Sequence, residues 1–344
     1  MIIDFHTHIW PDALAPRAIG SLSETAGGIF TPVTDGTAQG LLTYMKSVGI
    51  DISVVQPVIT KEKQAFSTNE WAATLSAARL PLQQAAASSA IAAVESGSAP
   101  QALKADAAST ADCAADSAPE SAPRLVAFGA VWPHSDAWRE QVDQAASLGL
   151  KGIKFHPEYQ QFTVDDETFF PMYDYILSKG MHILFHAGYD PGYPPPFHSS
   201  PAQFARIIRE LAPAAPKAES ASVSHTASEM QPKVQPAPGE RGSIILAHLG
   251  SSRMWDAVES EVAGLNCYID TSMGFFDYGK EQFLRIARKH GTDRILFATD
   301  SPWSNAADEI NALRSLAEGS EVDTALTSEE VDAILGGNAA RLLA

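Results

Sequence analysis

The stretch Asp4-Phe5-His6-Thr7-His8 ends the first apolar run of the chain and determines how the other runs are interpreted. Side chains alternate between the two faces of a β-strand, so His6 and His8 point in the same direction. Two imidazoles about 6–7 Å apart on one face of a strand end can reach a single metal ion. The motif therefore predicts a metal site, with an ordinary polar junction between strand and loop as the alternative.

Further apolar runs follow, and amphipathic segments separate most of them. Several are continuous in Val, Ile, Leu and Phe, which is typical of parallel strands covered on both faces. Repeated strand–helix alternation favours a closed (β/α)8 barrel, the TIM-barrel architecture, over an open doubly wound sheet. The predicted strands are Ile2–His6, Ile52–Pro57, Leu125–Trp132, Gly152–His156, His182–His186, Ser243–His248, Cys267–Asp270 and Arg294–Thr299.

Three of the later strands end in residues that bind metals or transfer protons. They end in Leu184-Phe185-His186, in Leu246-Ala247-His248 and in Ala298-Thr299-Asp300. The carboxyl ends of barrel strands meet at one face, where the active site of such a barrel lies. Because buried polar groups are costly unless they are paired, these strand ends together indicate an active site and not a set of structural histidines.

Two stretches interrupt the alternation, at about 81–123 and 212–241. Both are rich in Ala, Ser and Pro and poor in the large apolar residues that offset ordering entropy. We expect low-complexity surface insertions there, with some helical character around Leu82–Val94. Without them the chain approaches the usual barrel size of about 250 residues. Residues 1–344 are therefore predicted to form a single barrel domain.

Composition narrows the class of protein. The formal net charge of −17 counts against nucleic-acid binding, which relies on Lys and Arg. No apolar run approaches the roughly 20 residues of a membrane span, and the N-terminus lacks the features of a signal peptide. Cys113 and Cys267 stand far apart, which excludes a disulfide scaffold and fits a reducing cytoplasm. The expected partner is a small-molecule substrate, without nucleic acid or membrane.

The order of these histidines and the final aspartate resembles the amidohydrolase superfamily, in particular its amidohydrolase-2 branch, which includes aminocarboxymuconate-semialdehyde decarboxylase. The motifs that carry the resemblance are IIDFHTH, GIKFHP, ILFHAG, IILAHLG, NCYIDTS, RILFATDSPW and ILGGNAARLL. It implies one divalent metal, most commonly zinc, with manganese and iron as alternatives, and homodimers are common in this branch. It assigns His6, His8, His186 and Asp300 as ligands and His248 as a catalytic histidine.

The residue types suggest the chemistry of such a site. Neutral imidazoles and a carboxylate leave a position open for water, whose pKa a metal lowers toward about 7. Asp300 can then act as a general base, and His248 can polarise the substrate or protonate a leaving group. Asp4 either orients His6 as an acceptor or has a structural role.

Four further residues are expected to bind substrate. Lys154 either binds a substrate carboxylate, forms a buried ion pair, or bridges two metals as a modified lysine. His156 is expected in the pocket wall or in a structural role, with metal ligation as the alternative. Arg253 matches the geometry of a carboxylate, with a salt bridge on a helix surface as the alternative. Trp303 fits an apolar or flat substrate, or packs at the barrel rim.

Weaker candidates lie near the same predicted mouth. Trp10 and Trp132 accompany Trp303, and His134 follows a strand end. The aromatic loop from Tyr189 to Phe197, with His198 after it, could cap the pocket.

The leading prediction is a metal-dependent hydrolase that uses metal-activated water on a C–N or C–O bond of a small organic acid derivative. A metal-dependent non-oxidative decarboxylase of an unsaturated or aromatic acid needs the same ligands and is the alternative. A carboxylate-binding arginine over the metal would favour decarboxylation, and Arg17 and Arg253 are the candidates. A barrel that only binds a ligand is disfavoured, because every expected ligand residue is present.

Overall fold

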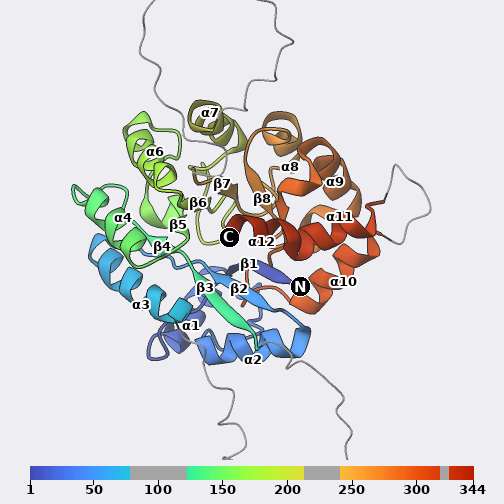
Figure 1. The fold of residues 1–344 in the computed structure, drawn as a ribbon, viewed down its shortest axis with the longest axis horizontal. Coiled ribbons are helices and arrows are strands. Elements are labelled where there is room, and N and C mark those ends of the chain that lie inside the picture. Colours follow the sequence, from blue (N-terminus) through green and yellow to red (C-terminus); the bar gives the residue numbers. More distant parts are fainter. Residues whose placement is uncertain (78–121, 213–240, 318–324) are drawn as a thin grey trace, which may run out of the picture.

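The structure is a computed structural model that describes residues 1–77, 122–212, 241–317 and 325–344. Helices surround a set of parallel strands, in the order that the strand–helix alternation predicts (Figure 1). The predicted insertions at 81–123 and 212–241 lie almost wholly outside the described residues. The same holds for the helical character expected around Leu82–Val94.

All strand pairs in the described ranges are parallel. The strands are β1 (Ile3–Thr7), β2 (Ile52–Val55), β3 (Arg124–Ala127), β4 (Gly129–Ala130), β5 (Gly152–Phe155), β6 (His182–Phe185), β7 (Ile244–Leu246), β8 (Tyr268–Asp270) and β9 (Ile295–Leu296). β3 and β4 are the two parts of the third predicted strand and are separated by Phe128. They therefore count as one strand of the predicted set of eight.

Backbone hydrogen bonds close these strands into a ring. Lys151 N donates to Ala127 O over 3.4 Å and joins β3 to the strand that follows β4. Phe5 N donates to Phe297 O over 2.9 Å, and Thr7 and Ser301 form a parallel bridge. The first and last strands are thereby paired, as a (β/α)8 barrel requires.

Helices follow the strands on the outside of the ring. They are α1 (Ala15–Thr25), α2 (Ala38–Val48), α3 (Ala65–Ala77), α4 (Trp138–Ser147), α5 (Pro157–Gln160), α6 (Phe170–Ser178), α7 (Pro201–Leu211), α8 (Trp255–Ala257), α9 (Phe275–His290), α10 (Ala306–Ser315), α11 (Ser328–Asp332) and α12 (Asn338–Leu343). α12 crosses the middle of the ring in Figure 1, and its Ala339 packs into the apolar interior of the barrel. Since His182, at the start of β6, contacts Leu342 O, α12 covers the amino-terminal end of the barrel.

The last strand is shorter than predicted. Regular pairing of β9 ends at Leu296, although the apolar run continues to Thr299. The next backbone donors bond outside the ladder: Phe297 N donates to Ile334 O, Ala298 N to Thr271 Oγ1 and Thr299 N to Asp4 Oδ1, each over 3.0 Å. The chain thus leaves the ladder without an unsatisfied buried donor.

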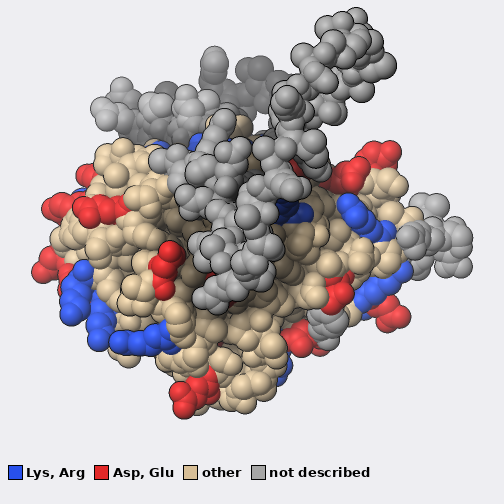
Figure 2. Space-filling view, turned by 90° about the horizontal axis from the view of Figure 1, so that it is seen from below, with Lys and Arg blue, Asp and Glu red and all other residues tan. Residues whose placement is uncertain are grey.

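The described helices include none that is long and apolar enough to cross a membrane. The described part of the face drawn in Figure 2 carries both acidic and basic side chains, with large uncharged areas between them. That distribution differs from the continuous basic surface that a phosphate backbone requires.

Candidate metal centre

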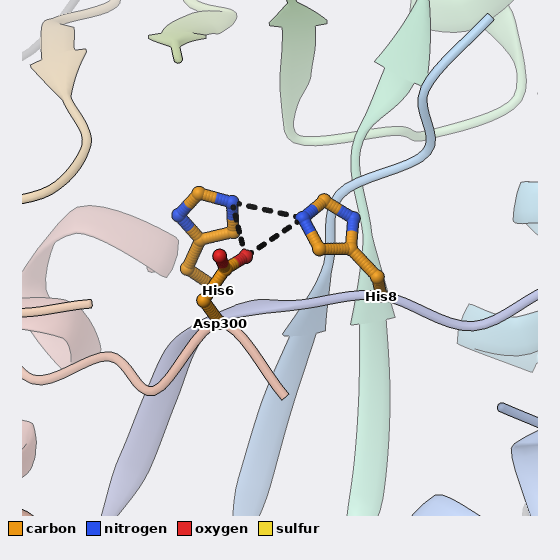
Figure 3. Close-up of side chains that lie close together, drawn as sticks. All are labelled: His6, His8 and Asp300. Carbon is orange, nitrogen blue, oxygen red and sulfur yellow. Dashed lines mark hydrogen bonds and ion pairs between the residues drawn. The ribbon is translucent and has the colours of Figure 1, made fainter. Parts of the chain in front are cut away.

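A cluster of His6, His8 and Asp300, called the first cluster, lies where the first and last strands meet (Figure 3). His6 Nε2 lies 3.2 Å from His8 Nε2 and 3.4 Å from Asp300 Oδ1, and His8 Nε2 lies 3.0 Å from the same oxygen. The backbone fixes this arrangement, since Asp300 N donates to His6 O over 2.8 Å. The closure of the barrel therefore brings together residues from opposite ends of the chain.

The remaining ring nitrogens determine which atoms face the centre of the first cluster. His6 Nδ1 lies 2.9 Å from Asp270 Oδ2, and His8 Nδ1 lies 2.7 Å from Gln56 O. Because both oxygens are acceptors, each Nδ1 carries the proton, and each Nε2 of a neutral ring presents a lone pair. These two lone pairs and the oxygen of Asp300 converge on one point and repel one another unless a cation lies between them. The residues present thus fit a divalent metal ion.

Electrostatics favour the protonation states that a metal site needs. Burial lowers the pKa of His6 well below its ordinary value, and the nearby Lys154 lowers it further. Burial by itself raises the pKa of Asp300, but the surrounding imidazoles, His6 first among them, more than offset this effect and keep the pKa below its usual value. A neutral imidazole and an ionised carboxylate are the forms that bind metals.

Asp270 organises the site, and the sequence analysis assigned it no role. Besides the ring of His6, it accepts the backbone N–H groups of His248 and Ser272, both over 3.0 Å, and the hydroxyl of Ser272. It is fully buried at the end of β8. The signal that could have found it was present, because the seventh predicted strand also ends in an acid.

Asp4 was predicted either to orient the ring of His6 or to have a structural role, and its contacts are those of the structural role. Its carboxylate accepts the backbone N–H of His6 over 3.3 Å and the hydroxyl of Thr299 over 2.6 Å. It therefore ties the first strand to the last, while the ring of His6 is oriented by Asp270 instead.

His248 lies between the two groups of histidines. Since Ser272 Oγ donates to Asp270, it accepts from His248 Nδ1, which lies 2.9 Å away. The unprotonated Nε2 of His248 then accepts from His186 Nδ1 over 3.0 Å. This order of donors leaves a lone pair on His186 Nε2, which is buried and has no hydrogen-bond partner among the described residues.

The second cluster consists of His156, His186 and Asp190. The two rings stack with their centroids 4.1 Å apart and their planes 9° apart, and His156 Nε2 lies 3.3 Å from Asp190 Oδ2. Burial lowers the pKa of both histidines well below the ordinary value. The structure thus groups His186 with His156 and Asp190, and its predicted role as a ligand beside His6 and His8 stays a prediction.

Lys154 is buried, and its amine points at the first cluster, with Nζ 3.0 Å from His6 Nε2. Burial lowers the pKa of its amine to about 8. Asp270 and Asp300 partly oppose this effect. The geometry therefore places the Lys154 amine beside the first cluster, and its predicted role in substrate binding stays a prediction.

Both clusters open into one cavity of about 550 Å³, which Lys154 and His248 also line. Arg17, Arg253 and Trp303 belong to its wall, as does Trp10. The guanidinium of Arg253 lies 4.4 Å from the centre of the Tyr189 ring and 3.7 Å from the carboxylate of Asp277. The tyrosine comes from the aromatic loop that the sequence analysis placed over the pocket.

Other candidates lie elsewhere. His134 is exposed, with its ring 3.1 Å from Gln161 O, and His198 binds the buried Glu158 over 2.6 Å. Neither histidine, nor Trp132, is part of the wall of this cavity.

A parallel barrel with a histidine–aspartate cluster at the carboxyl ends of its strands defines a class of metal-site enzymes. The chain belongs to the amidohydrolase family. The family model Amidohydro_2, described as Amidohydrolase, matches residues 3–344. This finding confirms the family that the sequence motifs indicated. The chain matches no curated protein sequence.

Several solved structures share the fold. 5-Carboxyvanillate decarboxylase from Sphingomonas paucimobilis is 14% identical, with a TM-score of 0.56 over 99% of this chain and 98% of that one. 2,6-Dihydroxybenzoate decarboxylase from Rhizobium is 16% identical, with a TM-score of 0.56 over 99% and 98%. The 5-carboxyvanillate decarboxylase from Novosphingobium aromaticivorans, solved with bound manganese, is 12% identical, with a TM-score of 0.58 over 100% and 97%. At these identities the likeness supports the barrel fold alone.

Proposed function

We propose that the chain is a metal-dependent enzyme that decarboxylates a small unsaturated or aromatic carboxylic acid without an external oxidant. The observation that carries the proposal is the shared cavity, in which Arg17 and Arg253 line the same space as the first cluster. The sequence analysis named an arginine over the metal as the feature that favours decarboxylation over hydrolysis. Decarboxylases among the structures with the same fold support this choice.

His6, His8 and Asp300 would hold the ion of this enzyme, with His186 as the fourth ligand that the family resemblance assigns. Two imidazoles and a carboxylate suit zinc, and manganese is the alternative. Such an ion, when bound, acts as a Lewis acid on a substrate oxygen or activates water.

The other residues of the cavity bind and orient the substrate. Guanidinium groups match the planar geometry of a carboxylate, and the amine of Lys154 places a further positive charge beside the first cluster. Trp10 and Trp303 provide flat apolar walls for a planar ring. His248 would accept a proton at Nε2, which accepts a hydrogen bond from His186 Nδ1 in the structure, since Ser272 and Asp270 fix the proton on Nδ1.

Hydrolysis, the leading prediction from the sequence, is the second candidate. Asp300 favours it, because a carboxylate that belongs to the proposed ligand set is well placed to act as a general base for water. The two reactions differ in their products, so one assay separates them.

The test is a screen of zinc- or manganese-loaded protein against aromatic and unsaturated acids, and against the amides and lactones of the same acids. Release of CO2 from the acids supports decarboxylation. Cleavage of amides or lactones without release of CO2 supports hydrolysis. If the metal-loaded protein neither releases CO2 from the acids nor cleaves the amides and lactones, both candidate reactions are contradicted. Arg253→Gln should raise KM for the acid at least about tenfold, because a charged hydrogen bond contributes roughly 1.5–3 kcal/mol. The matched control Arg241→Gln, whose guanidinium pairs with Asp174 on the surface, should leave KM unchanged.

A further inference from the structure

We propose that Glu309 is a positioning residue, which holds two loops of the cavity wall against each other and thereby sets how well the cavity binds its substrate. The two loops follow β8 and β9. Met273 from the first loop and Trp303 from the second line the cavity, whereas Glu309, in α10, is not part of the wall. Its effect on substrate binding rests on the proposed function, but the position of the loops can be followed without a substrate.

The carboxylate of Glu309 contacts both loops. Its Oε1 accepts the hydroxyl of Ser304, the neighbour of Trp303, over 2.8 Å. On its other side the carboxylate lies directly against Gly274, the neighbour of Met273, where a Cβ would overlap Oε2. Only glycine leaves room for this approach. Glu309 therefore joins the loop after β8 to the loop after β9 through one side chain.

The backbone of the first loop needs such a support. Met273 lies in the left-handed region, at φ 57°, which is uncommon for a residue other than glycine. Such a conformation persists only where the surrounding structure fixes it. Glu309 packs against the next residue and is part of these surroundings.

The stability of the fold does not explain a carboxylate at this position. Glu309 is 1% exposed, and its Oε2 has no hydrogen-bond partner in the described part of the chain. Burial raises its pKa from 4.5 to about 7, although Ser304 and the backbone N–H of Phe275 partly oppose this effect. The folded state therefore binds the proton more tightly than the unfolded state, so stability falls as the pH rises from 4.5 to 7. A neutral glutamine should fold at least as well.

The charge of Glu309 instead changes how firmly the loops are held. An ionised carboxylate accepts charge-assisted hydrogen bonds, which are roughly twice as strong as neutral ones. The titratable groups that interact with it are Asp308, exposed on α10, and Tyr278, buried on α9. Burial and the nearby Glu309 raise the pKa of Tyr278 well above its ordinary value, so this phenol stays neutral. The loops are thus held more firmly above pH 7 than below it.

The first experiment needs neither substrate nor added metal. Full-length protein as purified is titrated from about pH 6 to about pH 8, across the pKa of Glu309. The fluorescence of Trp303 is the difference between proteins with and without the Trp303→Phe substitution. We expect a step near pH 7 in the wild type and none in Glu309→Gln. The matched control Asp308→Asn removes an exposed acid from the same helical turn and should keep the step.

The second experiment separates KM from kcat with an acid that the enzyme converts. Between pH 8 and pH 6, KM of the wild type should rise about three- to tenfold more than KM of Glu309→Gln, because protonation weakens the hydrogen bonds to the loops. The glutamine variant should have the higher KM at pH 8, with kcat and metal content unchanged. Ser304→Ala removes a donor and leaves the buried carboxylate in place, so it should also raise KM at pH 8.

Three results would overturn the role of Glu309. They are a fluorescence step of equal size in wild type and Glu309→Gln, the absence of any step in the wild type, and equal KM values at pH 8. Thermal unfolding at pH 8 gives a further check, since a glutamine variant much less stable than the wild type would show a purely structural role. If that variant does not fold, KM of Ser304→Ala decides in its place.

Failure of the proposed function has a different signature. If no acid is decarboxylated but the fluorescence step depends on Glu309, the loops are positioned as proposed and the reaction is another one. If acids are decarboxylated and the step does not depend on Glu309, the reaction stands and the positioning role is wrong.

Discussion

The two histidine clusters of the cavity are built in different ways. In the first cluster, each imidazole has a partner behind it: Asp270 supports His6, and Gln56 O supports His8. In the second cluster, the rings of His156 and His186 stack on each other, and His186 Nδ1 is paired with His248 Nε2. His156 Nδ1 has no hydrogen-bond partner among the described residues. Hydrogen bonds at Nδ1 therefore fix both rings of the first cluster but only His186 in the second.

This difference shows that the number of candidate ligand residues alone is a poor guide to the metal affinity of a site. Partners behind the ligands fix ring orientation and proton position, and their loss typically costs 10–100-fold in affinity. We therefore expect the partners behind His6 and His8 to contribute to Zn²⁺ affinity. The following predictions test that comparison, from the largest effect to the smallest.

Removing a ligand of the first cluster should have the largest effect. His6→Ala takes away a nitrogen to which His8, Asp300 and Lys154 are all directed. We expect loss of bound metal and at least about 10³-fold lower turnover, since a catalytic metal contributes several kcal/mol. Elemental analysis of the purified variant checks the first effect, and unchanged metal content would defeat the ligand assignment.

His248→Ala should retain metal but lose turnover. His248 contacts His186 and Ser272, and is not among the converging donors of the first cluster. The expected loss is about 10²–10⁴-fold, the usual contribution of a general acid or base. Activity near that of the wild type, measured at equal metal content, would contradict the catalytic role of this residue.

A buried histidine outside both clusters should affect stability alone. His290 donates from Nε2 to Cys267 O over 3.0 Å and accepts from Gly264 N at Nδ1 over 3.2 Å, so only its neutral form fits. Burial lowers its pKa from 6.5 to about 4. The folded state therefore binds fewer protons than the unfolded state between these values, and stability falls as the pH drops from 6.5 to 4. At 1.36 kcal/mol per pKa unit, the full loss is about 3 kcal/mol.

Urea unfolding of metal-free wild type and His290→Gln between pH 4 and pH 7 measures this effect. Gln keeps polar contacts but does not titrate, so the variant should have a flatter pH dependence. Equal slopes in both proteins would show that His290 does not contribute.

Replacing Asp270, which lies behind the proposed ligand His6, should have the smallest effect, and we expect that effect at the first cluster. Asp270→Asn weakens the acceptor for His6 Nδ1 without removing any ligand. We expect about 10–100-fold weaker zinc binding at the first cluster. Competition with a chromophoric chelator measures the affinity, and an unchanged affinity would contradict the supporting role of Asp270.

The sequence was sufficient to predict the barrel and most of the cavity. Four strand ends could be recognised in the sequence because each follows an apolar run, and a barrel brings such ends to one face. They are those at His6, His186, His248 and Asp300. Periodicity gave the strands within a few residues. It could not show that β9 ends early, because the side chains that take its donors come from Asp4 and Thr271.

The grouping of the histidines could not be predicted from the sequence. Strand order places His186 and His156 next to each other, but the choice between one shared site and two depends on side-chain rotamers. The hydrogen bond between His186 and His248 settles the direction of that ring, and it joins residues on different strands. Asp190 lies in a loop, where spacing gives no direction for the side chain.

The pairing of the first and last strands has a consequence for how the chain matures. His6 and Asp300 stand almost a chain length apart, and their backbones are joined by hydrogen bonds only when the ring closes. A growing chain that has not yet released Asp300 from the ribosome lacks one donor of the first cluster. A metal ion could therefore be held by the complete first cluster only after this non-local contact has formed. An ion bound at the first cluster would stabilise the closed barrel, because its donors come together only when the first and last strands have paired.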